Sequence, residues 1–133
     1  MNPFYTGVAS LAGHRCEYCH APEAVFNFPF EVEHIVPIAR GGTSNEANLA
    51  LACRSCNLHK AIHLSGEDPQ SGEMVRLFRP REETWEDNFT VNDESDEMQG
   101  LTPTGRATAA RLDMNSPAQR AARRQWRRLG FFP

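Results

Sequence analysis

The fold of this 133-residue chain is decided by residues 30–63, FEVEHIVPIARGGTSNEANLALACRSCNLHKAIH. Within 34 residues the segment holds the pair Glu33-His34, a Gly-Gly turn, an Asn-Leu step and a Cys-x-x-Cys motif. A second Cys-x-x-Cys motif lies upstream, at Cys16 and Cys19. Because so many polar groups accompany paired cysteines, the pattern favours a metal site over an ordinary apolar core.

The four cysteines form two motifs, Cys16/Cys19 and Cys53/Cys56, with 33 residues between them. Two disulfides or four buried thiols are the alternatives, but the N-terminus lacks the pattern of a secretion signal, which favours zinc. Four thiolates fill the tetrahedral shell of Zn²⁺ and leave no position for a reactant. The sequence therefore predicts a structural zinc, whose binding contributes about 10–16 kcal/mol in small zinc peptides.

Around this site the sequence predicts an α+β fold. Aromatic and β-branched residues over 30–36 predict a strand, and 49–52 predict a second, after the turn at Gly41-Gly42. A helix is expected from residue 53 or 54 to about 64, where Ser65-Gly66 would end it. The local order is therefore strand, loop, strand, helix. The helical histidines His59 and His63 are expected to pack, or to support metal ligands from outside, rather than to bind a metal themselves.

The rest of the chain is expected to form an extension of short strands, a hairpin and two helices. A strand is expected over 74–78, hairpin arms over 88–91 and 98–101, and helices from 103 to about 112 or 114 and from 117 to 129. Each helix opens on a Thr-Pro or Ser-Pro step, which places a capping hydroxyl before a proline at the first helical position. We expect residues 1–66 to be the core and 67–133 an extension packed on it.

Charge is segregated along the chain, although the net charge is only −3. Residues 82–97 hold eight acidic residues and no basic one, whereas residues 103–128 hold seven arginines and one acidic residue. The arginines of the last helix have two interpretations, a stripe that contacts nucleic acid or a face that pairs with the acidic segment.

Residues 14–64 resemble the HNH endonucleases, also called ββα-metal nucleases. The resemblance rests on both cysteine motifs, on the segment Glu33-His34-Ile35-Val36-Pro37, on the glycine pair, on Asn48-Leu49, and on Asn57 through Lys60. It is strongest to stand-alone bacterial HNH proteins with a four-cysteine zinc, of the HNN variant. The family implies a ββα-metal core of treble-clef type.

The resemblance also implies a chemistry, the metal-dependent hydrolysis of DNA phosphodiester bonds. His34 would be the general base, Glu33 and Asn57 would hold Mg²⁺ or Mn²⁺, and Asn48 would brace the loop that carries His34. The residue types suit these roles, because imidazole accepts protons near neutral pH and hard cations prefer oxygen ligands.

The expected partner is DNA, with RNA as an alternative, and the basic residues expected to contact its phosphates are Lys60, Arg79, Arg81, Arg123 and Arg127. No apolar run reaches the length of a membrane span, so we expect a soluble, cytoplasmic protein without a membrane partner. The oligomeric state, monomer or dimer, is left open. The alternative function is a non-catalytic zinc module that binds nucleic acid or a protein partner.

Overall fold

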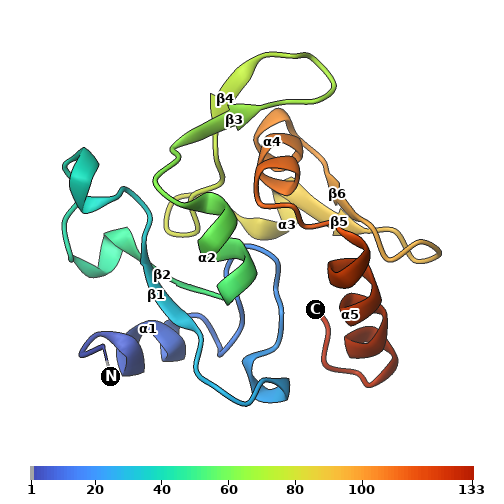
Figure 1. The fold of residues 1–133 in the computed structure, drawn as a ribbon, viewed down its shortest axis with the longest axis horizontal. Helices are drawn as coiled ribbons and strands as arrows, with labels where there is room; N and C mark the ends of the chain where they lie inside the picture. The colour runs from blue at the N-terminus through green and yellow to red at the C-terminus, as the bar shows by residue number, and fades with distance from the viewer. Residues whose placement is uncertain (1) are drawn as a thin grey trace.

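The computed structural model describes residues 2–133, which form small antiparallel strand pairs surrounded by short helices (Figure 1). The α-helices are α1 (Tyr5–Leu11), α2 (Arg54–Lys60), α3 (Trp85–Asn88), α4 (Pro103–Arg111) and α5 (Pro117–Arg128). The strands are β1 (Glu31–His34), β2 (Leu49–Ala52), β3 (Ser65–Glu67), β4 (Met74–Arg76), β5 (Phe89–Val91) and β6 (Met98–Gly100). Three 3₁₀ helices are η1 (Glu23–Val25), η2 (Ile38–Arg40) and η3 (Glu46–Asn48). The expected α+β class is confirmed.

The centre of the fold is a strand–strand–helix unit. β1 pairs with β2 in an antiparallel register that sets Glu33 opposite Ala50 and His34 opposite Leu49. α2 follows β2 after a single residue, Cys53, whose sulfur accepts the Cys56 backbone N–H and so caps the helix. Both α1 and α2 pack on the strand pair, and every residue of β2 is buried. The ββα core is therefore present as expected.

The helix of this unit is shorter than predicted, since residues 61–64 form a turn, and a strand rather than a loop follows at residue 65. α2 ends at Lys60, and Ala61 adopts a φ of +49°, which is outside the helical region. The chain then extends into β3, where Gly66 pairs with Val75 of β4. A Cβ on Gly66 would lie 3.2 Å from the Leu77 side chain, so the glycine serves close packing rather than ending a helix. The expected core boundary at residue 66 falls inside this strand.

The C-terminal extension contains the predicted hairpin and the two predicted helices. β5 pairs with β6, and α4 packs against β3, β4 and β6. The caps are those expected, since the Thr102 hydroxyl accepts the Gly105 N–H at 2.9 Å and the Ser116 hydroxyl accepts the Gln119 N–H at 3.2 Å. These local bonds explain why the starts of both helices can be read from the sequence.

The extension packs closely on the ββα core through Trp85. The Trp85 indole N–H donates to the Tyr18 carbonyl at 2.8 Å, and its ring stacks on His20 at a centroid distance of 3.7 Å. Arg81 also forms an ion pair with Glu17 of the first cysteine loop. Over residues 2–133, no helix has both the length and the apolar character needed to cross a bilayer.

Candidate functional site

The four cysteines converge on one buried point. Their sulfur atoms all lie within 4.8 Å of one another, and Cys19 Sγ is 3.7 Å from Cys53 Sγ. A disulfide would need about 2.05 Å, whereas four sulfurs at the Zn–S distance of about 2.3 Å from one ion lie roughly 3.8 Å apart. All four are free thiols. The donor set and its spacing thus fit a closed zinc site, which holds the first cysteine loop against the start of α2.

Glu33 is buried against Tyr18 of the first cysteine loop and belongs to an ion pair. Its Oε1 lies 2.7 Å from Lys60 Nζ, and its Oε2 accepts the Tyr18 hydroxyl at 2.9 Å. The Lys60 ammonium also donates to the Ile35 carbonyl at 2.9 Å. Burial raises the pKa of Glu33, while Lys60 and the Tyr18 hydrogen bond act in the opposite direction. Both carboxylate oxygens are therefore engaged by protein groups.

Asn57 lies against a different carboxylate, that of Glu31. The Asn57 amide contacts Glu31 Oε2, and Arg54 Nη1 approaches Glu31 Oε1 at 3.5 Å. Because alternate residues of a strand share a face, Glu31 and Glu33 both point from β1 toward α2. Glu31 contacts Asn57, whereas Glu33 contacts Lys60, which lies about one turn after Asn57 on α2. Glu33 and Asn57, the expected ligand pair, are therefore each engaged by a different partner.

His34 ends β1 beside a tightly closed loop. Its Nε2 lies 3.0 Å from the Ser44 hydroxyl. Asn48 closes the loop, because its Oδ1 accepts the Val36 N–H at 2.8 Å and its Nδ2 donates to the carbonyls of Val36 and Thr43 at 2.9 and 2.7 Å. These are the backbone hydrogen bonds expected of Asn48. They hold the end of β1, and with it His34, in a defined position.

The HNH endonuclease family model matches residues 16–61, a range that includes both cysteine motifs, β1, β2 and α2. Residues 16–61 form an HNH domain. The match indicates a nuclease-type function for this segment. Comparison of the chain with curated proteins and with solved structures gave no match.

Two of the basic residues expected to contact phosphate, Lys60 and Arg123, are buried in the structure and have partners within the protein. Lys60, beside the HNH metal region, is 2% exposed and neutralised by Glu33. Arg123 is fully buried, where its guanidinium donates to the Asp96 carbonyl at 2.8 Å and to the Met114 carbonyl at 2.7 Å. Charged groups without solvent access cannot reach a DNA backbone.

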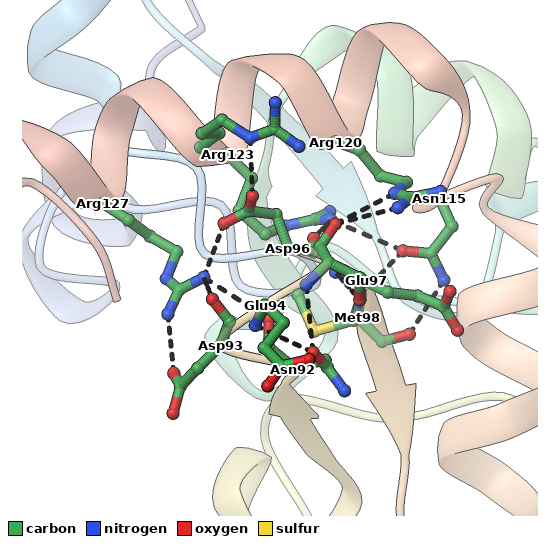
Figure 2. Close-up of polar contacts among 12 residues, drawn as sticks. Asn92, Asp93, Glu94, Asp96, Glu97, Met98, Asn115, Arg120, Arg123 and Arg127 are labelled. Atoms are coloured by element: carbon green, nitrogen blue, oxygen red, sulfur yellow. Dashed lines mark hydrogen bonds and ion pairs between the residues drawn. The ribbon is translucent and has the colours of Figure 1, made fainter.

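The other basic residues of that set are paired with acidic ones. Arg81 pairs with Glu17, Arg79 with Glu82, and Arg127 with Asp93 and Asp96. Figure 2 shows Arg120, Arg123 and Arg127 of α5 directed at the β5–β6 turn, where Asp96 receives Arg127 and, at 2.8 Å, Arg124. Of the two interpretations of the arginine helix, the structure supports pairing with the acidic segment.

Among residues 2–133, the cysteine cluster is the only group of three or more cysteine, histidine or acidic side chains that converges on one point. A hard cation beside β1 would therefore have fewer than three cysteine, histidine or acidic ligands from the protein. Glu31 supplies a carboxylate whose side chain is 37% exposed. The Asn57 amide nitrogen faces this carboxylate, and a 180° rotation of the amide group would put its oxygen there instead. Magnesium sites often use one or two carboxylates and keep several waters, so Glu31 and Asn57 fit such an ion and Glu33 does not.

Sequence reasoning missed three residues that shape this HNH domain, namely Glu31, Ser44 and Tyr18. The period of two in β1 is a signal that could have identified Glu31, because it puts residues 31 and 33 on the face toward α2. Tyr18 and Ser44 had no such signal. Burial raises the pKa of Tyr18 far above its usual value, with Glu33 adding to the effect, so Tyr18 stays a neutral donor to that carboxylate.

Proposed function

We propose that this chain is a nuclease that hydrolyses phosphodiester bonds of DNA, with His34 as its general base. The observation that carries the proposal is the His34 side chain at the end of β1, in an HNH domain whose loop is closed by Asn48. The zinc centre has the structural role, since its four thiolates leave no coordination position for water or phosphate.

The contact with Ser44 is compatible with the tautomer of His34 that a general base requires. If Nε2–H donates to the Ser44 hydroxyl, the lone pair of Nδ1 is free to accept a proton from water. That water attacks the phosphorus atom, and the proton moves to Nδ1 as the new P–O bond forms and the bond to the leaving oxygen breaks. Asn48 and Ser44 are positioning residues in this scheme, since they hold the ring and touch no substrate.

We also propose that Mg²⁺ or Mn²⁺ is a second cofactor, held by Glu31 and Asn57 rather than by Glu33. Such a cation, when bound, stabilises negative charge on the phosphate and on the leaving oxygen. Carboxylate and amide oxygens are the ligand types these ions prefer. Glu33 then has a structural role as the buried partner of Lys60.

The test of the reaction is the conversion of supercoiled plasmid to open circles, followed with Mg²⁺, Mn²⁺ and no added divalent cation, and with an RNA of matched length as competitor. His34→Ala should lower the nicking rate by at least about 100-fold. His59→Ala is the matched control, because His59 lies on α2 with its ring directed at Ser55 and Asp113. Equal nicking by wild type and His34→Ala would reject the base. Binding of plasmid without any cleavage would assign the chain to the non-catalytic zinc modules.

The cation assignment has its own test, the binding of Mn²⁺ followed by electron paramagnetic resonance on zinc-loaded protein. Glu31→Gln and Asn57→Ala should each weaken Mn²⁺ binding by about tenfold or more, a loss seen even for groups that only orient metal ligands. Glu33→Gln should leave the affinity unchanged. If Glu33→Gln alone lost Mn²⁺ binding, with an unchanged zinc content and circular dichroism spectrum, the cation would be assigned to Glu33 instead.

A further inference from the structure

Most of the arginines in the described part of the chain donate to a carboxylate or to a backbone carbonyl, and three do not. These three are Arg40, Arg111 and Arg128, all of them exposed. Arg128 is on α5, where acidic residues of the β5–β6 turn lie close by. The Arg111 guanidinium instead contacts His63 Nε2, and Arg40 lies near enough to His63 for its charge to act on the imidazole. We refer to Arg40, His63 and Arg111 as the His63 patch.

The surroundings of the His63 patch are positively charged. The pKa of His63 is lowered by desolvation and then by Arg111, Arg40 and Lys60, all of which are cations. Lys60 is neutralised by Glu33, so the charge that remains for a ligand comes from the two arginines. A surface whose guanidinium groups have no acidic partner attracts anions, and the arginine fork can bind two phosphate oxygens at once.

The patch joins the HNH domain to the C-terminal extension. Arg40 ends η2 in the loop that Asn48 closes, the same loop whose Ser44 contacts His34. This loop is compact, because a Cβ on Gly42 would lie 1.8 Å from the Val36 carbonyl oxygen. Arg111 ends α4, and its Cβ lies 3.4 Å from the Cβ position of Gly66 in β3, close to His63. The two arginines therefore extend from closely packed backbone segments.

We propose that Arg40, His63 and Arg111 bind backbone phosphates of the DNA strand next to the bond that is cut. This inference rests on the proposed function and adds the surface that holds the substrate. Contacts to phosphate carry no base identity, so the patch provides affinity and register without sequence preference. The C-terminal extension thus contributes Arg111 to substrate binding, whereas its arginine helix is occupied by the protein's own acidic turn.

The test is the salt dependence of binding to a short fluorescein-labelled DNA duplex, measured by anisotropy without added divalent cation so that cleavage does not interfere. Each phosphate contact adds about 0.9 to the slope of log K against log salt concentration. Arg40→Gln and Arg111→Gln should each reduce the slope by about 0.9, and the double variant by about 1.8. Arg128→Gln removes the same charge at another site and should leave the slope unchanged.

The possible outcomes separate this inference from the proposed function. Unchanged slopes in both patch variants, with wild type binding and cutting DNA, would overturn the patch and leave the nuclease in place. An equal reduction in Arg128→Gln would show that overall charge, and not the patch, sets the affinity, which also overturns the inference. Failure of the wild type both to bind and to nick DNA would reject the proposed function itself. Zinc content, measured for every variant, verifies that the fold is retained.

Discussion

Replacing Lys60 with methionine should strongly destabilise this protein, because it leaves the Glu33 carboxylate buried without its cation. The two side chains are 2% and 4% exposed, and Lys60 Nζ lies 2.7 Å from Glu33 Oε1. Removing one partner of a buried ion pair costs about 3–5 kcal/mol. The Tyr18 hydroxyl still bonds Glu33, but the Ile35 carbonyl loses its donor. We therefore expect Lys60→Met to lower the free energy of unfolding by about 3–5 kcal/mol.

The stability lost in Lys60→Met should increase with pH. Burial already raises the pKa of Glu33 above that of an unfolded chain, and Lys60 is the largest factor that opposes this. Without Lys60 the folded state holds a proton on Glu33 that the unfolded state releases, so stability falls as pH rises from the usual glutamate pKa toward the raised one. The deficit of Lys60→Met should therefore be larger in mildly alkaline than in mildly acidic buffer.

The measurement is urea unfolding of zinc-saturated protein at several pH values. Arg54→Met is the matched control, since Arg54 is also on α2 and pairs with Glu31 of the same strand, but with side chains 74% and 37% exposed. That variant should change stability by less than about 1 kcal/mol. The double variant Glu33→Gln, Lys60→Met should recover a large part of the loss. A Lys60→Met deficit below about 1 kcal/mol that is independent of pH would refute the buried pair.

Three further predictions concern the zinc, the loop and the arginine helix. Cys16→Ser should lose bound zinc and its cooperative unfolding transition; a variant that folds normally without zinc would contradict the structural role. Asn48→Ala removes three backbone hydrogen bonds and should cost about 2 kcal/mol as well as most nicking activity, and full activity would count against its bracing of His34. Arg123→Met leaves two buried carbonyls without a donor and should cost about 2–4 kcal/mol. Arg124→Met should cost less than about 1 kcal/mol, since Arg124 is half-exposed and Asp96 keeps Arg127 as a partner; equal effects of the two variants in urea unfolding would show that burial of Arg123 is irrelevant.

Features that depend on short-range geometry could be predicted from the sequence. The spacing of Cys16, Cys19, Cys53 and Cys56 was sufficient for the zinc centre, because a Cys-x-x-Cys loop can direct both sulfurs at one ion whatever surrounds it. The first residues of α4 and α5 followed from a hydroxyl before a proline, since the cap bond spans only three residues. The motif around His34 and Asn48 was enough to identify the HNH domain.

Other features required the tertiary structure, because they join residues that are far apart in the chain. The sequence placed Glu33 beside His34 but could not reveal that Lys60, 27 residues later, neutralises it, or that Asn57 lies against Glu31 instead. In the same way β3 exists only because β4 pairs with it, and a local turn signal at Ser65-Gly66 was misleading.

The sequence by itself thus determined the four-cysteine cluster, the ββα unit and the HNH segment at residues 16–61, since each depends on residue type and local spacing. Only the tertiary structure decided which charged side chains remain accessible to a ligand. Whether a charged side chain can meet a ligand depends on its burial and on the partner that the fold brings to it, and neither quantity is encoded at one position. Lys60 and Arg123 are therefore buried with partners inside the protein, whereas Arg40 and Arg111 are exposed without an acidic partner, and Arg111 contacts His63.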